Sequence, residues 1–360
     1  MRDNIRRISG LAVVALTATG ALAGCGANDA ESGSGGDGAS DSAKTIALLL
    51  PESKTTRYES QDKPLFEAKV ADLCDDCEVK YYNADQDPGK QQQQVEAAIT
   101  DKVDAMVLDP VDGEAAASLV ADAQAADIPV LAYDRFIEGA DYYMSFDNAQ
   151  VGTLQAEALL DAMGGSGSIL MLNGAPTDPN AAQFKKGAHA VIDDSDVEVL
   201  AEYDNPDWSP DNAQSWTSDQ LNKFDPADIT GVYAANDGQA GGVVAAMTGA
   251  GVARDALPPI TGQDAELAAI QRIVAGEQYM TVYKPIKTEA EKAAEVAVQM
   301  ANDEEISGTE DFEGVASFIF DPIVVTVDNI ADTVVADGFH KVEDICTDDY
   351  ADACAEAGLS

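Results

Sequence analysis

The sequence predicts an α/β protein of two doubly wound units, each a parallel sheet covered by helices. Short continuous apolar runs such as 45–50 and 130–133 are typical of strands that are buried on both faces. Stretches with helical periodicity alternate with these runs, and parallel strands joined in this way need right-handed crossover connections. The alternation restarts near Val151, which indicates a second unit of similar size.

The first unit contains the clearest alternation. We expect strands at 45–50, 78–83, 105–108 and 130–133, and helices at about 57–73, 91–100 and 113–126. The helix at 91–100 begins with a run of glutamines, but Val95, Ala98 and Ile99 have helical spacing. We therefore interpret it as a helix with a solvated face and not as a low-complexity tract.

The second unit repeats this pattern. We expect helices at 151–163, 180–192, 211–223 and 239–249, and strands at 168–172, 198–203, 231–234 and 259–261. Beyond this unit, helices at 266–275 and 287–302 flank a strand at 279–283, and 318–327 is extended.

The N-terminus predicts export. Basic residues in 2–7 precede an apolar stretch at 11–23, which is too short for a typical membrane-spanning helix. The sequence Leu-Ala-Gly-Cys at 22–25 resembles the bacterial lipobox, so we expect a signal peptide at 1–24, a lipid on Cys25, and anchoring to the outer face of the cytoplasmic membrane. The alternative is an ordinary secretory signal with a chance cysteine. The segment 26–43 is rich in Gly, Ser and Asp and predicts a flexible tether.

The charge of the chain excludes one class of partner. With 21 basic and 65 acidic residues, the formal net charge is −44, and such a surface repels nucleic acid. We expect no cofactor and no metal, because only His189 and His340 are available and neither lies near a Cys-x-x-Cys pair.

Four cysteines remain after Cys25. In an oxidising exterior an even set predicts two disulfides, Cys74–Cys77 and Cys346–Cys354. The alternative for the first pair is a redox motif, but the intervening acids raise the pKa of a thiol and disfavour a reactive thiolate. We therefore expect local structural crosslinks, the second of which closes a tail at 346–360.

Polar and aromatic side chains follow almost every expected strand. Asp134 and Arg135 come directly after the strand at 130–133, and ligands of open α/β sheets bind beyond the carboxyl ends of strands. The other residues in such positions are Arg57, Tyr58, Asp178, Asn180, Trp208, Asn236, Asp264 and Lys284.

Structural explanations exist for single members: a surface ion pair for Asp134–Arg135, a helix cap for Asn236 or Asp237, a turn for Asp178, a surface charge for Lys284 and a core position for Trp208. As a set, these residues are harder to explain by capping.

The residue types indicate a sugar. Carboxylates, amides and cations pair well with vicinal hydroxyls, which both donate and accept hydrogen bonds. The rings of Tyr58, Phe184 and Trp208 offer flat faces for the C–H side of a pyranose. A glycosidase could use Asp134 and Asp264 as its two carboxyl groups. Arg135 and Lys284 would keep such acids ionised, and common nucleophile and metal motifs are missing, so we expect a binding protein and not an enzyme.

Several segments carry a resemblance to a known family. They are VLAYDR, YYMSFDN, VGTLQA, TDPNAAQF, NDGQAGG, ITGQDAELAAIQRIVAGEQYMTVYKPI and DGFHK, and they span about 45–341. They resemble the sugar-binding proteins of bacterial ABC importers, in particular those for D-xylose and for multiple sugars. The resemblance implies the type I periplasmic binding fold, in which three crossovers join two lobes and the sugar lies between them.

The resemblance also implies the lobes and the contacts. The first lobe would be 44–146 with 264–303, and the second 147–263 with 304–345. The first crossover would lie at about 145–148. The implied sugar contacts are Arg57, Asp134, Arg135, Asp178, Asn180, Asn236, Asp264 and Lys284, with Trp208 and Phe184 as stacking rings. The family pattern has tryptophan where this chain has Tyr58, which leaves the preference among xylose, glucose, arabinose and galactose open.

The implied function is the monosaccharide-binding component of an ABC importer, with D-xylose as the first expectation. Hinge closure would then present the sugar to a membrane permease with its ATPases. We expect a monomer that contacts the membrane only through its lipid. The alternative is a lipid-anchored sensor that presents an aldose to a signalling receptor.

Overall fold

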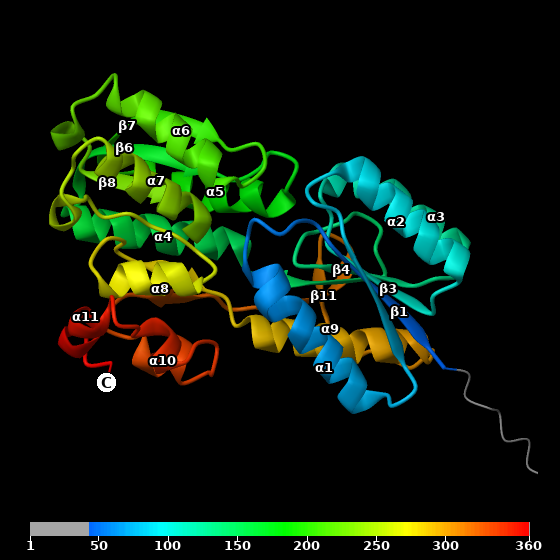
Figure 1. Ribbon diagram of the computed structural model, residues 1–360. Coiled ribbons are helices and arrows are strands. Elements are labelled where there is room, and N and C mark those ends of the chain that lie inside the picture. Colours follow the sequence, from blue (N-terminus) through cyan, green and yellow to red (C-terminus); the bar gives the residue numbers. More distant parts are fainter. Residues whose placement is uncertain (1–42, 360) are drawn as a thin grey trace, which may run out of the picture. The chain divides into compact units, whose positions relative to one another are not determined.

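The computed structural model describes residues 43–359 (Figure 1). The predicted signal peptide, Cys25 and the predicted tether up to residue 42 lie outside the described residues. Within 43–359, none of the helices combines the length and the apolar character that a membrane crossing requires.

The first sheet has seven strands in the order β10-β11-β5-β4-β3-β1-β2. All neighbours are parallel except β10 and β11, which are antiparallel. The strands are β1 Thr45–Leu50, β2 Glu78–Asn83, β3 Ala105–Leu108, β4 Val130–Tyr133, β5 Tyr142–Phe146, β10 Glu310–Phe312 and β11 Val315–Phe320.

Helices cover both faces of this sheet because its strands are apolar on both sides. Along β1, Ile46 and Leu48 pack under α1 Lys63–Leu73 and α9 Ile286–Ala301, which lie side by side in Figure 1. Ala47 and Leu49 point to the other face, under α2 Pro88–Asp101 and α3 Gly113–Ala125. This alternation is the two-residue period of a strand, applied to a sheet with no solvent face.

The second sheet is built in the same way around a shorter set of strands. Its order is β7-β6-β8, with β6 Ser166–Asn173, β7 Asp196–Asp204 and β8 Gly231–Ala234. Helices α4 Asn148–Met163 and α5 Pro179–Ile192 cover one face, and α6 Pro210–Leu221 and α7 Asp237–Gly249 cover the other. The expected fold of two doubly wound lobes is confirmed.

Single bridges extend the second sheet. Val232 pairs with Ile260, and Gln263 pairs with Val282 of β9 Thr281–Tyr283. β9 in turn pairs antiparallel with β12 Ile323–Val325. Helices α8 Leu267–Val274, α10 Val342–Ile345 and α11 Ala351–Glu356 share one apolar cluster beside these strands.

The structure differs from the expected elements at three places along the chain. β5 was not expected as a separate strand, because it follows β4 through a loop with no helix between them. The expected strand at 259–261 makes only the single bridge at Ile260. The extended segment 318–327 is interrupted at Asp321-Pro322, where proline lacks the N–H that a ladder needs, and it divides into β11 and β12.

The predicted lobe boundaries also need correction. β10 and β11 belong to the first sheet, although 304–345 was assigned to the second lobe. β9 adjoins Gln263, so 264–283 lies with the second sheet and not with the first. The crossings therefore fall at Asp147, at Lys284-Pro285 and at Asp321-Pro322. We define the first lobe as 43–146 with 285–320, and the second as 147–283 with 322–359.

Two crossings lie side by side. The backbone N–H of Asp147 donates to the carbonyl oxygen of Phe320 at 3.0 Å, where β5 and β11 end together. The lobe bounds implied by the resemblance placed the second crossing between residues 263 and 264. Strand pairing between distant segments carries no local sequence signal, which explains the error.

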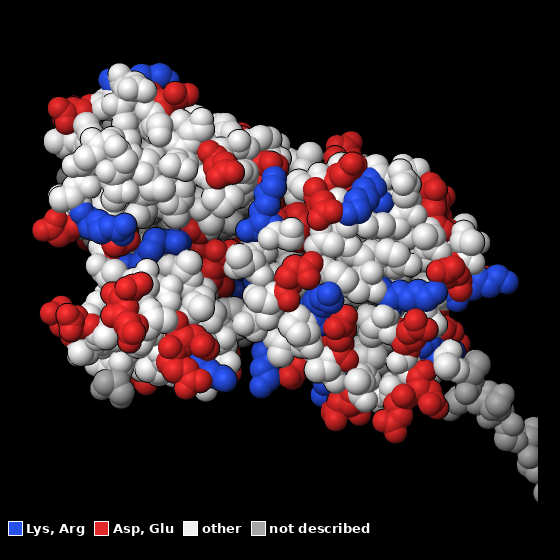
Figure 2. All heavy atoms as spheres, viewed as in Figure 1, with Lys and Arg blue, Asp and Glu red and all other residues white. Residues whose placement is uncertain are grey.

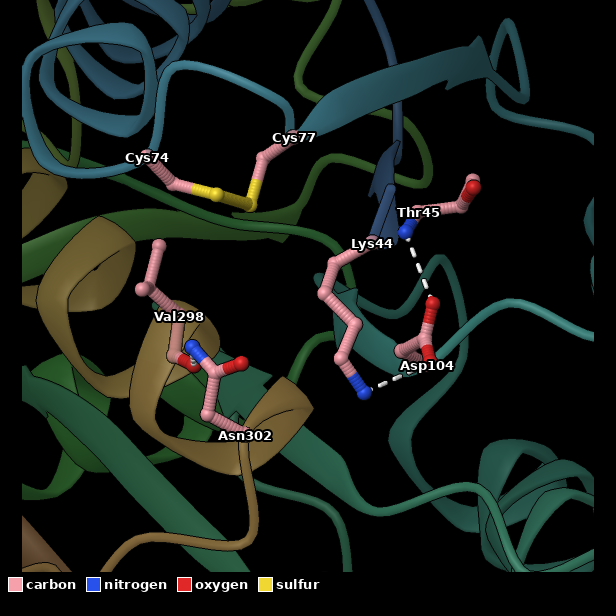
Figure 3. Close-up of a disulfide and its surroundings, with 7 residues drawn as sticks. All are labelled: Lys44, Thr45, Cys74, Cys77, Asp104, Val298 and Asn302. Carbon is pink, nitrogen blue, oxygen red and sulfur yellow. Dashed lines mark hydrogen bonds and ion pairs between the residues drawn. A yellow bond between two sulfur atoms is a disulfide. The ribbon is translucent and has the colours of Figure 1, made fainter. Parts of the chain in front are cut away.

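Both predicted disulfides are present. Cys74–Cys77, with an S–S distance of 1.94 Å, joins the end of α1 to the start of β2. Figure 3 shows it beside Val298 of α9 and Asn302, which follows that helix, and close to the ion pair of Lys44 with Asp104 at 3.2 Å. Cys346–Cys354, at 2.04 Å, joins the end of α10 to α11. Each is a local crosslink, as expected.

The surface carries charges of both signs. On the face shown in Figure 2, acidic side chains are scattered widely, with basic side chains among them. Within 43–359, no group of three or more potential metal ligands is found.

Candidate ligand-binding cavity

A cavity lies where the carboxyl ends of strands from the two lobes meet, and its empty space is about 260 Å³ including a part that is open to solvent. All eleven predicted site residues line it: Arg57, Tyr58, Asp134, Arg135, Asp178, Asn180, Phe184, Trp208, Asn236, Asp264 and Lys284. Thr55 and Gln263 line it as well and were not predicted.

The first-lobe wall consists of Arg57, Tyr58, Asp134 and Arg135. Arg57 precedes the helical turn η1 Tyr58–Asp62 at the end of the loop after β1. Asp134 directly follows β4 with a φ of +57°, a conformation that costs a non-glycine residue about 1–3 kcal/mol. Its carbonyl oxygen accepts from Ser145 Oγ at 2.6 Å and from Asn180 Nδ2 at 3.0 Å, which hold this backbone in place.

Arg57 is held by several carboxylates. Its Nε and Nη2 donate to Asp62 at 3.0 and 2.7 Å, and Nη2 also donates to Glu289 at 3.2 Å. Its Nη1 lies 3.4 Å from Asp134 Oδ1. Burial alone would lower the pKa of Arg57, but these acids outweigh it and raise that pKa well above its ordinary value. The guanidinium is a fixed cation in a fixed orientation.

Asp134 is correspondingly a fixed anion. Burial alone would raise its pKa, but the positive charges of Arg57, Lys284 and Arg135 lower it to about 2. The Tyr58 hydroxyl donates to Asp134 Oδ2 at 2.9 Å and adds to this effect. A carboxyl group that stays ionised at neutral pH is poorly suited to act as a general acid.

The adjacent Asp134 and Arg135 do not form a surface ion pair. Each side chain belongs to a residue that is 2% exposed. Arg135 Nε instead lies 2.9 Å from Asp178 Oδ2 of the second lobe, and Nη1 donates to the Pro110 carbonyl at 3.0 Å. Arg135 therefore links the two lobes at the edge of the cavity.

The second-lobe wall comes from helix starts and loops after its strands: Asp178, Asn180, Phe184, Trp208, Asn236, Gln263 and Asp264. Asp178 caps α5 by accepting from Asn180 N at 2.8 Å, and Asn236 caps α7 by accepting from Gln239 N at 3.0 Å. The capping interpretation is thus correct for Asn236, and Asp178, whose alternative was a turn, also caps a helix. Capping leaves each of them at the cavity as well, because the capped helices start there.

Trp208 provides the largest flat surface of the cavity. Its ring meets Phe184 edge to face with centroids 6.3 Å apart, and its Nε1 donates to Asp178 Oδ2 at 3.0 Å. Gly174 lies against the ring, where a Cβ atom would come within 2.0 Å of it. Glycine at 174 is therefore required for this ring position.

Lys284 and Asp264 close the cavity at the second crossing. Lys284 follows β9, and its Nζ lies 2.8 Å from Asp264 Oδ1. Lys284 is buried, which excludes the surface-charge interpretation. Gln263 precedes Asp264, and its buried Oε1 has no hydrogen-bond partner among residues 43–359. Prediction from the sequence selected the charged residue of this pair and overlooked its neutral neighbour.

The described geometry fits a known family. Residues 46–305 match the sequence profile of the family described as periplasmic binding protein domain, which is more than half of the chain. This chain belongs to the periplasmic binding protein family. Its two-lobed architecture is the type I fold of that family, as expected from the sequence.

Individual relatives agree with this assignment. The chain is 35% identical over 310 residues to the D-xylose-binding periplasmic protein of Haemophilus influenzae, covering 83% of this chain and 91% of the relative. It is 36% identical over 314 residues to the protein of the same name from Escherichia coli, covering 83% and 92%. These relatives are named as binding proteins, and the expectation of a non-enzymatic periplasmic binding protein is confirmed.

A solved structure is also similar. The carbohydrate transporter solute binding protein of Chloroflexus aurantiacus, in complex with D-glucose, has a TM-score of 0.74 and 28% identity. The match covers 84% of this chain and 98% of that chain.

Proposed function

We propose that this chain is the extracytoplasmic sugar-binding component of an ABC importer and that D-xylose is its preferred ligand. The observation that carries the proposal is the lining of the cavity, in which carboxyl groups, cations and amides lie together with the ring of Trp208. Sugar hydroxyls both donate and accept, so they can satisfy such a mixed lining, while the C–H face of the ring packs on an aromatic surface.

Two observations support a small aldose such as xylose. The empty space between the lining residues is at most about 260 Å³, because this volume includes a part open to solvent, so it leaves little room beyond a single sugar ring. The relatives with 35% and 36% identity are named for D-xylose. The Tyr58 hydroxyl is already bonded to Asp134, so the exchange of tryptophan for tyrosine changes the lining of this wall without adding a free group.

Delivery would proceed by hinge closure. Polar contacts between the lobes surround the cavity: Asn180 Nδ2 donates to the Asp134 carbonyl at 3.0 Å, and the Thr56 N–H donates to Glu266 Oε1 at 3.1 Å. Lys54 also pairs with Asp207 across the lobes. A sugar that contacts both walls would favour this closed arrangement over an open one, and the closed face would dock on the permease.

The binding test is a thermal-shift panel of D-xylose, D-glucose, L-arabinose and D-galactose on the chain without residues 1–25. A ligand that binds only the folded state raises its melting temperature by mass action, and we expect the largest rise with D-xylose. No rise with any aldose would overturn the sugar proposal. A larger rise with a hexose would overturn the xylose assignment alone.

The transport and anchoring steps have separate tests. Deletion of the gene should abolish uptake of the bound sugar in cells, and unchanged uptake would favour the sensor alternative. Metabolic labelling with palmitate should mark the wild-type chain and not the Cys25→Ala variant. Equal labelling of both would exclude lipid attachment at Cys25.

A further inference from the structure

Asp237 is a buried carboxylate that does not line the cavity, although it is the first residue of α7. Its Oδ2 accepts from the Glu266 N–H and from Thr281 Oγ1, each at 2.9 Å. Its Oδ1 accepts from Gln278 Nε2 at 2.8 Å. Three donors from three positions after Gln263 therefore converge on one side chain.

The segment bound by Asp237 has an unusual backbone. Asp264 and Ala265 are consecutive non-glycine residues with φ of +90° and +49°. Such conformations persist only where the surroundings hold them, and they cluster at ligand sites. The Ala265 N–H donates to Thr281 Oγ1 at 3.2 Å, while that hydroxyl donates its own proton to Asp237. Thr281 thus connects the strained backbone to the carboxylate.

The surroundings of the other Asp237 carboxylate oxygen, Oδ1, are also restricted. A Cβ atom at Gly262 would lie 2.0 Å from Asp237 Oδ1. The Asp237 N–H donates to the Gln263 carbonyl at 3.1 Å, so both ends of 262–266 are fixed to the same residue.

We propose that Asp237, acting with Thr281, is a positioning residue for the cavity. It holds 263–265 in the backbone that directs the Asp264 carboxylate toward Lys284 and places Gln263 at the cavity. This role rests on the proposed sugar-binding function, because Asp264 and Gln263 would contact the sugar. A residue with a purely structural role would change stability and leave the affinity of the folded protein unaltered.

The test removes the connecting hydroxyl. Thr281→Val keeps the side-chain volume but loses both hydrogen bonds, and Thr281→Ser restores the hydroxyl. Thr217→Val is the matched control, because Thr217 is fully buried on α6 and its hydroxyl has no partner within 43–359. Asp237→Ala is informative only if it folds, whereas Thr281→Val keeps the proposal testable in either case.

Two readouts are needed. In sugar-free protein, Thr281→Val should speed amide hydrogen exchange at Ala265 and Glu266 about tenfold, while Thr281→Ser and Thr217→Val stay within about twofold of wild type. The Kd for the best aldose of the panel should rise about tenfold in Thr281→Val only. In an Asp264→Asn background the same substitution should add little, because its effect passes through Asp264.

Unchanged exchange in Thr281→Val, or faster exchange with an unchanged Kd, would overturn the positioning role. If the wild-type chain binds no aldose, the proposed function fails instead, and hydrogen exchange alone then decides whether Asp237 and Thr281 hold the segment.

Discussion

The two walls of the cavity differ in how far their polar groups are already paired within the protein. In the first lobe, the charged groups are bound to one another: Arg57 to Asp62 and Glu289, and Asp134 to Arg57 and Tyr58. These bonds lie within one lobe, although Arg135 of the same wall pairs with Asp178 of the second lobe and the Asp134 carbonyl accepts from Asn180 of that lobe. In the second lobe, the Gln263 amide oxygen has no partner within 43–359.

The two walls therefore have different roles when a ligand binds. The first-lobe wall is preorganised, and preorganised polar groups lose little freedom when a ligand binds. In the second-lobe wall, the Gln263 amide oxygen keeps a hydrogen-bonding capacity that a ligand could use. Substitution of Asp134 in the first wall should therefore lower both stability and affinity, whereas substitution of Gln263 in the second wall should lower affinity alone.

Asp134→Ala should have the largest effect. It removes the acceptor of the Tyr58 hydroxyl and one anion beside Arg57, so we expect the Kd for the best aldose to rise about 100-fold and the free energy of unfolding to fall by about 1–3 kcal/mol. Calorimetric titration and urea unfolding measure the two quantities.

Asp112→Ala is the control for this change. Asp112 caps α3 by accepting from Ala115 N at 2.9 Å and does not line the cavity. It should lose about 1 kcal/mol of stability with an unchanged Kd. If Asp134→Ala lost stability without any loss of affinity, the proposed difference between the two walls would be wrong.

Trp208→Phe should have the next largest effect. The smaller ring keeps a flat face but loses the donor to Asp178, so we expect a Kd about tenfold higher. The chain has two tryptophans, and Trp216 stacks on Tyr203 at 5.3 Å outside the cavity lining. A sugar-dependent change in fluorescence should survive Trp216→Phe and disappear in Trp208→Phe, and the reverse pattern would place the ligand elsewhere.

Gln263→Leu tests whether the unpartnered amide oxygen of Gln263 contributes to ligand binding. We expect a Kd about fivefold higher and a melting temperature equal to or above that of wild type, because a buried amide oxygen without a partner is removed. The matched control is Gln155→Leu on α4, whose buried amide also has no partner within 43–359 and does not line the cavity. It should match the thermal effect and leave the Kd unaltered. A lower melting temperature in Gln263→Leu but not in Gln155→Leu would show that Gln263 stabilises the second-lobe wall without a ligand.

Glu266→Gln should have the smallest effect on affinity and a clear effect on pH dependence. Burial and the nearby Asp264 raise the pKa of Glu266 from 4.5 to about 7. The folded state then holds a proton that the unfolded state has lost, so stability falls as pH rises between these values, by roughly 2–3 kcal/mol. Urea unfolding from pH 4.5 to 7 should show this extra decrease in wild type and not in Glu266→Gln. Parallel curves for both proteins would contradict the raised pKa.

Much of the fold could be predicted because its strands are continuous apolar runs. The bounds of β1, β3 and β4 agree with the predicted ranges, since no other structure suits such short runs between helices. The assignment of β11 to the first sheet could not be predicted, because β11 pairs with β5 across nearly half of the chain. Local pattern carries no information on which distant strand is the neighbour.

The cavity could be predicted from charged and aromatic residues at strand ends, and its supporting residues could not. Asp62 and Glu289 lie on helical segments away from any strand end, where an acidic residue is ordinarily a surface charge. Only the folded structure brings them to Arg57. Gln263 was overlooked because a neutral amide beside an acid has no distinctive pattern.

The acids that hold Arg57 and Arg135 also determine which sugars can enter. The cavity and the groups directly behind it contain more carboxyl groups than cations: Asp62, Asp109, Asp134, Asp178, Asp264 and Glu289 against Arg57, Arg135 and Lys284. Burial raises the pKa of Asp109 and of Glu289 well above the ordinary value, which relieves part of this excess without reversing it. We expect the cavity to reject uronic acids and sugar phosphates, although they present the same hydroxyls. The negative charge of these metabolites would exclude them whatever their stereochemistry.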